Sequence, residues 1–502
     1  MTEREALLAA VCKAPADDTP RLVFADWLDE TGDPADAKRA AYIRAAVAQW
    51  RLEDAGTPAA LVHAFLDDRR FLSGDRALLD PVDWAAVDPD VGAIYAADRA
   101  RRAVRLPRAA LAAGLPVVKG VTFDREDVGG FYNEVAVRDP AAFLAHAAAI
   151  YRAAPIYFLS FRGSRRVTAE FTRDFVAAGH LARTQWLAFD DIEPEAMRVL
   201  GDHPDAAGVE LLEIDVSEDE LVEQFVAGPH WTGLTDLYVR RFWDGGDAVS
   251  ALVPLCPRFR GLRHLSIIGD MVGDETARAI ATGGLTELQN LDLRFSHVSS
   301  DGAAALAGSS KLPNLRYLDL EDCGRVGAEG VSRLLVSPKL KNLLALRAAR
   351  CGSDGVLLDP KALTGPGRGP RLRALELDST RTIGPRALAA LAACPAAQGL
   401  WFLSLADCEV TDTGLRGLAR SAGLRELAVL DVSQNQLTDA AAQVIADWPV
   451  PLQGINLMQN PIGAAGAKAL IKSPHRQGLK RVLIEGRGRP HLRTHFGKRV
   501  VP

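Results

Sequence analysis

The chain has 502 residues, of which 48% are hydrophobic and 25% charged, and its formal net charge is −5. This composition is that of an ordinary soluble protein and excludes fibrous or low-complexity chains. So small a net charge gives no reason to expect a nucleic acid or an acidic substrate as partner. The length exceeds the usual limit of one compact core, whereas a repeat architecture escapes that limit because its core grows in one dimension.

Targeting and membrane signals are not apparent in the sequence. Residues 1–8 are too charged for the apolar part of a signal peptide, and no stretch approaches the roughly 18 apolar residues of a membrane span. The six cysteines are scattered without metal-ligand spacing, so we expect buried free thiols; a disulfide or a metal site is the alternative. We therefore expect a cytoplasmic protein in a reducing compartment.

Three helices are predicted before any repeat begins. The first covers Glu3–Lys13. Asp18-Thr19-Pro20 offers an N-cap residue and a proline for the start of the second, which ends at Gly32. A third has apolar residues along one side up to Trp50. We predict a small all-α domain over residues 1–52.

Part of this region has a recognisable sequence. Asp17–Pro34 reads DDTPRLVFADWLDETGDP, and Arg39–Arg44 reads RAAYIR. These segments resemble the bacterial repeat-companion domain, a short N-terminal module that precedes leucine-rich repeats; Ala41 replaces a more usual acidic residue and Tyr42 a more usual Phe. The resemblance implies a repeat-bearing protein and implies no activity.

Residues 53–115 are predicted to form a helical linker region. A helix is expected over Leu61–Phe71 and a turn over Pro81–Trp84. The run Asp98–Arg108 is basic. We interpret it as a solvated helix face, and a patch for nucleic acid or an acidic partner is the alternative.

A repeat dominates the rest of the chain. Leu315–Cys323 reads LRYLDLEDC, which matches the leucine-rich repeat pattern L-x-x-L-x-L-x-x-N/C. The pattern recurs every 25–29 residues or so, within the range of this repeat. The strong copies begin at Leu288, Leu315, Leu343, Leu372, Leu400, Leu427 and Leu452. Weaker copies are Tyr132/Val135/Val137, Ile156/Leu159/Phe161, Thr184/Leu187/Phe189, Leu211/Ile214/Val216, Leu234/Leu237/Val239, Leu262/Leu265/Ile267 and Leu479/Val482/Ile484.

Each repeat predicts one strand and one helix. The apolar residues of x-x-L-x-L are two apart and face one side of a strand, and the second half has helical spacing, as in Gly463–Ile471. Stacked units bury these faces against one another. We predict an α/β leucine-rich repeat solenoid of about fourteen repeats over residues 116–486, with a parallel concave sheet and a helical convex face. The long period resembles the ribonuclease-inhibitor-like subclass.

The chain ends in a predicted cap. Residues 487–502 contain Leu492, Phe496, Val500 and Val501, which can cover the apolar end of the last repeat. The segment 472–499 is rich in Lys and Arg with one acid, Glu485. We interpret the basic residues as a solvated cap, and a nucleic-acid tail is the alternative.

No catalytic motif is recognisable, so we expect no enzyme activity, no cofactor and no metal. Gly365–Pro370 is glycine-rich but lacks the Lys-Ser/Thr of a phosphate-binding loop. His203, His230 and His264 lie in successive repeats without a partner at ligand spacing. The pairs Asp190/Asp191 and Asp292/Asp319 are interpreted as surface carboxylates with ordinary pKa values.

Function is expected on the concave face, at the positions two, four and six residues after the first Leu of each repeat. These positions mix acids with aromatic residues and Arg, the types enriched at binding hot spots. Trp186, Tyr238 and Tyr317 have no core role in this register. The candidate binding residues are Trp186, Tyr238, Arg240, Asp292, Arg294, Tyr317, Asp319, Glu321, Arg347, Glu376, Asp378 and Phe402.

These features favour a non-enzymatic protein-binding scaffold or adaptor. The acidic residues from Asp292 to Asp378 favour a basic protein partner. Two alternatives remain: a nucleic-acid-associated protein that uses segments 99–108 and 472–499, and an inhibitor or regulator of a partner enzyme. The second alternative rests on analogy of fold. The sequence names neither the partner nor the oligomeric state.

Overall fold

A computed structural model of the chain describes residues 2–501 apart from residues 54–55, 73–75, 105, 108–110, 113, 125–128, 164–165, 242–251, 271, 353–357, 365–368, 380–382, 422 and 487–488. The chain divides into two compact units, which are described separately. The first unit comprises residues 1–56, 93–245 and 256–264, and the second comprises residues 57–92, 246–255 and 265–502. The boundaries predicted at residues 52, 115 and 486 follow a different division and stay predictions.

The first unit begins with the three expected helices, α1 (Glu3–Lys13), α2 (Asp18–Glu30) and α3 (Pro34–Glu53). The N-cap of α2 is Asp17, whose side chain accepts a hydrogen bond from the Thr19 amide at 2.8 Å. The helix therefore starts at Asp18, two residues before Pro20, the predicted first helical residue. The three helices pack together around a cluster of apolar side chains, to which Phe131, just before strand β2 (Glu134–Val137), also contributes. The cluster consists of Val11, Phe24, Ala25, Leu28, Ala40, Ile43, Val47 and Phe131.

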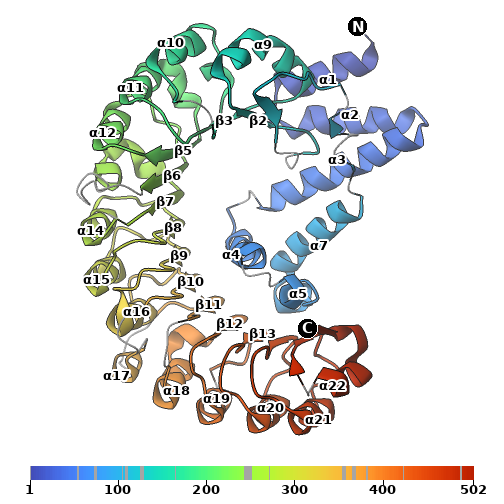
Figure 1. The fold of residues 1–502 in the computed structure, drawn as a ribbon, viewed down its shortest axis with the longest axis vertical. Coiled ribbons are helices and arrows are strands. Elements are labelled where there is room, and N and C mark those ends of the chain that lie inside the picture. The colour runs from blue at the N-terminus through green and yellow to red at the C-terminus, as the bar shows by residue number, and fades with distance from the viewer. Residues whose placement is uncertain are drawn as a thin grey trace. The chain divides into compact units, whose positions relative to one another are not determined.

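Strands and helices alternate in the rest of the first unit. Strand β1 pairs antiparallel with β2, and the following strands pair parallel in chain order up to β6. The helices α9–α12 lie on one side of these strands (Figure 1). The elements are β1 (Val121–Phe123), β2 (Glu134–Val137), α9 (Pro140–Ala153), β3 (Phe158–Phe161), α10 (Ala169–Ala177), β4 (Trp186–Phe189), α11 (Pro194–Asp202), β5 (Leu211–Val216), α12 (Asp219–Ala227) and β6 (Asp236–Arg241).

The register of β5 differs from the prediction by two residues. Leu212 pairs with Leu187 and Ile214 with Phe189, so this repeat begins at Val209 and not at Leu211. A shift of two residues keeps each side chain on the same face of a strand. Glu213 and Asp215 therefore stay on the concave side as predicted.

The second unit contains the strong repeats. Its strands β8–β16 pair parallel in chain order, with helices α14–α21 on one side (Figure 1). Two elements contain residues of both units: strand β7 (His264–Ile268), whose first residue is the last of the first unit, and helix α7 (Pro89–Ala103). The further elements are α14 (Asp274–Thr282), β8 (Asn290–Asp292), α15 (Ser300–Gly308), β9 (Tyr317–Asp319), α16 (Gly327–Leu335), β10 (Ala345–Arg347), α17 (Pro360–Leu363), β11 (Ala374–Glu376), α18 (Pro385–Ala393), β12 (Phe402–Ser404), α19 (Asp412–Ala419), β13 (Val429–Asp431), α20 (Asp439–Ala446), β14 (Gly454–Asn456), α21 (Ala464–Lys472) and β15 (Arg481–Leu483).

The ninth residue of these repeats holds the turn after the strand. Asn435 is buried, and its amide nitrogen donates to the carbonyl of Leu405 in the preceding repeat at 2.8 Å. Where Cys replaces Asn, the thiol takes over that role: Cys323 Sγ lies 3.1 Å from the carbonyl of Leu293. These cysteines therefore hold the turn by a hydrogen bond as well as by packing. All six cysteines of the chain are buried free thiols, as expected.

The residue before the ninth position takes a left-handed conformation. Its φ lies between 51° and 60° at Phe295, Asp322, Arg350, Ser379, Asp407, Gln434 and Gln459. Residues other than glycine adopt this region at a cost of about 1–2 kcal/mol. The hydrogen bonds of the ninth residues therefore stabilise a turn that the residue in the left-handed conformation does not favour.

The second unit ends with α22 (Arg489–Phe496) and β16 (Val500–Val501), which pairs parallel with β15. Leu492, Phe496 and Val500 are buried, as the predicted cap requires. Strand β16 was not predicted, because a two-residue strand leaves no periodic pattern.

Three helices of the second unit come from the region predicted as a linker: α4 (Pro58–Leu72), α5 (Arg76–Leu79) and α6 (Trp84–Val87). Helix α4 contacts β9, and α5 contacts β14 and β15. In Figure 1 these two helices lie on the side of the strands opposite α15–α21. The concave face of the second unit is therefore covered by a segment of its own chain.

None of the helices in the described part of the chain combines the length and the apolar character needed to cross a membrane.

Candidate functional site: the concave faces of the two units

The concave face of the first unit is formed by β4, β5 and β6, and we call it the first-unit surface. At its centre Arg240 is half-buried among three carboxylates. Its Nε lies 2.5 Å from Asp215 Oδ1, and its Nη2 lies 3.0 Å from Glu213 Oε1 and 3.5 Å from Asp190 Oδ1. Arg162 forms a second ion pair with Glu213. The surface is thus a charge network that water reaches.

The electrostatics of this network are set by partial burial. Burial raises the pKa of Asp215, and the charges of Asp190 and Glu213 act in the same direction, against the hydrogen bond from Arg240. Carboxylates outnumber guanidinium groups at this point, so the surface keeps a negative character. A cation that approaches it is attracted without having to open a closed core.

Trp186 lies at the edge of the first-unit surface and is half-buried. Its ring centroid lies 6.1 Å from that of Trp50 on α3, 5.5 Å from that of Tyr157 and 5.6 Å from that of Phe158. The prediction that Trp186 has no core role is wrong, because α3 packs its last turn against this strand. Tyr238, in contrast, is half-buried on β6 beside Arg240.

The concave face of the second unit is formed by β8–β13, and we call it the second-unit surface. Asp292 and Arg294 lie at its first strand and are half-buried. The guanidinium group of Arg294 contacts both carboxylate oxygens of Asp292 at 2.9–3.2 Å, and Ser266 donates to Asp292 Oδ2 at 3.1 Å. This end of the surface resembles the first-unit surface in its exposure.

Its centre is different, because Arg347 is almost completely buried, with a side-chain exposure of 2%. Its Nη1 lies 2.9 Å from Asp319 Oδ2, and its Nε lies 3.1 Å from Glu376 Oε2. Both carboxylates are buried as well. Three charges without access to water require one another, since each alone would carry a desolvation penalty of several kcal/mol.

Asp319 shows the effect of that burial most strongly. Burial raises its pKa to about 7, while the charge of Arg347 opposes the shift and that of Asp292 adds to it. The Tyr317 hydroxyl donates to Asp319 Oδ2 at 3.0 Å, and the Glu321 amide donates to Oδ1 at 2.9 Å. The prediction of a surface carboxylate with an ordinary pKa is wrong for Asp319, because α4 covers it.

Two aromatic residues of the second-unit surface are also buried. Tyr317 is 6% exposed and Phe402 is 0% exposed. Both rings contact Phe65 of α4, with centroid separations of 5.5 Å and 6.1 Å. The prediction that Tyr317 has no core role is wrong, because its ring packs in a core between α4 and the strands.

The remaining candidates lie near the rim. Glu321 is half-buried and forms an ion pair with Arg350 at 2.5 Å. Asp378 accepts hydrogen bonds from Ser404 Oγ at 2.5 Å and from the Ala406 amide at 2.9 Å. Of the twelve predicted residues, the structure therefore leaves Trp186, Tyr238, Arg240, Asp292, Arg294, Glu321 and Asp378 partly exposed and buries Tyr317, Asp319, Arg347, Glu376 and Phe402.

The other residues considered in the sequence are not brought together. His203 lies 3.6 Å from Asp205, and His264 lies 2.8 Å from Asp236. Within the described residues, no three His, Cys, Asp or Glu side chains form a group that could hold a metal ion. Most of the glycine-rich stretch at 365–370 lies outside the described residues.

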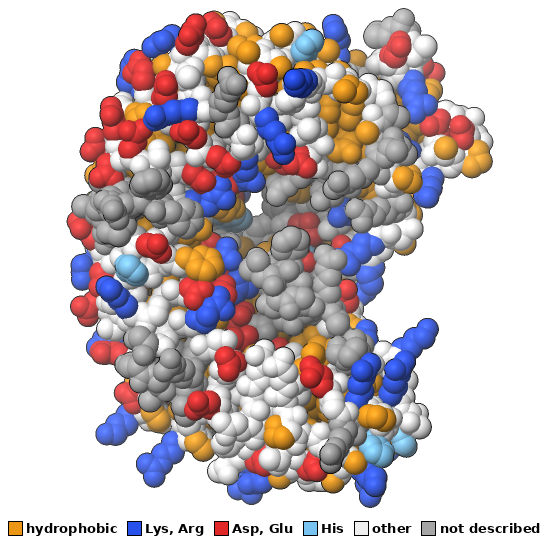
Figure 2. Space-filling model, viewed as in Figure 1, with side chains coloured by type: hydrophobic (Ala, Val, Ile, Leu, Met, Phe, Trp, Pro, Cys, Tyr) orange, Lys and Arg blue, Asp and Glu red, His pale blue; other side chains and the backbone are white. Residues whose placement is uncertain are grey.

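The two basic segments are partly used for structure. Arg102 forms an ion pair with Asp98 at 2.7 Å, and parts of segment 99–108 lie outside the described residues. In the C-terminal segment, Arg481 Nη1 donates to the Lys498 carbonyl at 3.0 Å, and Arg499 Nη1 donates to the Leu479 carbonyl at 3.2 Å. Other basic side chains gather on the outside of α21 and α22 (Figure 2).

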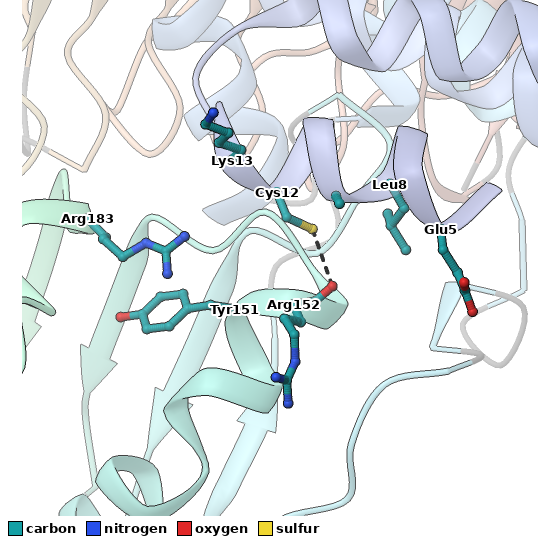
Figure 3. Close-up of a pocket in the computed structure, with 8 residues that line it drawn as sticks. Glu5, Leu8, Cys12, Lys13, Tyr151, Arg152 and Arg183 are labelled. Atoms are coloured by element: carbon teal, nitrogen blue, oxygen red, sulfur yellow. Dashed lines mark hydrogen bonds between the residues drawn. The ribbon is translucent and has the colours of Figure 1, made fainter. Parts of the chain in front are cut away.

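A cavity of about 410 Å³ was not foreseen from the sequence. It lies in the first unit between α1 and α9 and is lined by residues from both helices and by Arg183 (Figure 3). Arg183 stacks on the Tyr151 ring at 4.7 Å from its centroid, and Cys12 Sγ lies 3.7 Å from the Arg152 carbonyl. Burial raises the pKa of Cys12 to about 11, so this thiol is not a nucleophile at neutral pH. No local motif could have found a cavity whose walls are about 140 residues apart.

One comparison with known proteins, that with a family model, agrees with the repeat assignment. A family model described as Leucine Rich repeat matches residues 311–335. Among solved structures, the chain is similar to the complex of Rad7 and Elc1 in yeast, with a TM-score of 0.40, 15% identity and coverage of 66% of this chain and 84% of that one. It is also similar to an internalin (inlF) from Listeria monocytogenes, with a TM-score of 0.39, 15% identity and coverage of 65% and 80%. No curated protein matches the chain. The fold is an α/β leucine-rich repeat solenoid.

Proposed function

We propose that the protein is a non-enzymatic scaffold that binds a protein partner through its concave residues. The observation that carries this proposal is the first-unit surface, where Tyr238 and Arg240 are half-buried beside four carboxylates. Tyr and Arg supply large contact area and multiple donors, which makes them frequent hot spots in protein interfaces. A regulator or inhibitor of an enzyme would use the same surface.

The charge of the first-unit surface favours a basic partner. Asp190, Glu213 and Asp215 pair with two guanidinium groups, those of Arg162 and Arg240, while Asp236 lies 2.8 Å from His264 Nδ1. The excess of carboxylates attracts Lys or Arg side chains and discriminates against acidic partners. The buried charges of the second-unit surface cannot do this while α4 covers them, so the first-unit surface is the preferred site.

The proposal is tested by changing charge at constant shape. Asp190→Asn with Asp236→Asn removes two carboxylates from the concave face, and Glu195→Gln with Asp202→Asn removes two exposed ones from α11 as a matched control. Wild type and each full-length variant are used for affinity capture followed by mass spectrometry. Proteins that the wild type captures should be absent with the concave variant and still present with the control variant. The proposal fails if wild type and both variants retain identical protein profiles.

The nucleic-acid alternative is supported by one observation, the exposed basic side chains around α21 and α22, among them Lys472, Arg476 and Arg493. A gel shift with single- and double-stranded DNA and RNA across a salt series tests it. Binding through phosphate contacts weakens steeply as salt rises. Absence of binding at low salt eliminates this alternative.

A further inference from the structure

Four side chains form a row across the second-unit surface. Tyr317, Ala345, Ala374 and Phe402 occupy the same position in β9, β10, β11 and β12, and the strand register pairs each with the next. Neighbouring strands lie about 4.8 Å apart, so the two aromatic residues are about 14 Å apart along the row. Two alanines between two rings leave a depression, which we call the aromatic notch. Its width matches one further aromatic ring.

Phe65 of α4 fills the aromatic notch. The side chain is completely buried, and its ring meets Tyr317 and Phe402 edge-on, at interplanar angles of 78° and 68°. The guanidinium carbon of Arg347 lies 5.1 Å from the centroid of the Phe65 ring. Edge-to-face packing and a cation close to the ring are both favourable interactions of an aromatic side chain. The notch therefore complements the Phe65 ring in shape and places a cation beside it.

The notch belongs to the strands and not to α4. The backbone hydrogen bonds that hold β9–β12 join neighbouring strands in register. Arg347 is held in place by Asp319 and Glu376, which also lie on those strands. These backbone hydrogen bonds and ion pairs involve no atom of α4, which comes from a segment about 250 residues earlier in the chain. Removal of α4 would expose a preformed site.

We propose that the aromatic notch is a receptor site for an amphipathic helix that carries an aromatic side chain, and that α4 is the internal ligand that a partner helix displaces. This inference rests on the scaffold function proposed above and adds to it the class of partner that the second-unit surface would bind. The expected chemistry of the partner follows from that of α4, the occupant in the structure: a helix with an aromatic residue close to Arg347. While α4 is bound, the second-unit surface is closed to partners.

The test uses a fluorescent peptide of residues 57–72 as probe and full-length protein as receptor. Phe65→Ala in the protein removes the internal ring, and this variant should bind the peptide at least tenfold more tightly than wild type. Ala64→Ser, at an exposed position of the same helix, is the matched control and should behave as wild type. A peptide with Phe65→Ala, or a receptor with Phe65→Ala and Ala345→Leu to fill the notch, should lose the binding.

Equal affinity of the peptide for wild type and the Phe65→Ala protein would overturn the inference. Hydrogen exchange of wild type gives a second test that needs no variant. Amides of residues 58–67 should exchange at least tenfold faster than those of β9–β12, because a displaceable helix opens locally. Exchange of both at the same rate would make α4 a permanent part of the core. If the peptide binds but the capture experiment yields no partner, the aromatic notch is supported as a binding site and the proposed scaffold function is refuted.

Discussion

The two concave surfaces use the same positions of the repeat for different purposes. In the first unit, Arg240 lies half-buried among carboxylates. In the second unit, Arg347 also lies among carboxylates, at the repeat position that Tyr238 holds in the first unit, and it is closed off from water beneath Phe65. A similar group of charges is open to water in one case and part of a buried core in the other. The covering helix, and not the repeat sequence, decides which of the two it becomes.

The largest effect should come from removal of the central cation. Arg347→Met is expected to cost about 3–5 kcal/mol of unfolding free energy, because Asp319 and Glu376 stay buried without a counter-charge. Arg240→Met should cost at most about 1 kcal/mol, because water reaches its partners. Urea denaturation followed by circular dichroism measures both. Similar costs would mean that the two surfaces are equally buried in solution.

The ninth repeat position should give the next largest difference. Asn435→Ala leaves several buried backbone groups without partners and should cost about 2 kcal/mol. Ser217 is the ninth residue of the repeat that begins at Val209, and it is exposed. Ser217→Ala should change stability by less than about 0.5 kcal/mol. The same denaturation curves measure both variants, and a large effect of Ser217→Ala would contradict the comparison.

The pH dependence should separate the surfaces further. The pKa of Asp319 is raised to about 7, so between pH 4 and 7 the folded chain binds more protons than the unfolded chain, and this residue lowers stability as pH rises. Asp319→Asn should remove most of that fall relative to wild type, because the variant has no carboxyl group to titrate at this position. Asp215→Asn should act in the same direction and less strongly, because Asp215 is only half-buried. Denaturation midpoints at pH 4, 5.5, 7 and 8 provide the measurement, and parallel curves for wild type and Asp319→Asn would refute the assignment.

The smallest effect concerns the turns. Gln434 is exposed and has φ of 55°, so Gln434→Gly should raise stability by about 0.5 kcal/mol. Gln434→Ala keeps the same backbone cost and serves as the control. In the first unit the turn after β3 already has glycine at a left-handed position, Gly163 with φ of 65°, and Gly163→Ala should lower stability by about 1 kcal/mol. Calorimetry resolves both signs, and a loss of stability in Gln434→Gly would show that its side chain supports the turn.

Local pattern was sufficient for the elements. The strong copies from Leu288 to Leu452 predicted β8–β14, because a strand with one buried face needs apolar residues two apart. The weaker copy at Leu211 placed the correct side chains on the concave face with a register two residues off. Its error arose because Leu211, Ile214 and Val216 imitate the pattern that Val209, Leu212 and Ile214 fulfil.

The candidate site was only half predictable. The sequence identified which side chains project from the concave face, since alternation along a strand is a local property. It could not show that α4 covers Tyr317, Arg347 and Phe402, because a contact across about 250 residues leaves no periodic signal in either segment. The sequence by itself therefore determined the repeat and the direction of its side chains. Only the tertiary structure decided which of them meet water, because burial depends on what packs against a face and not on the face itself.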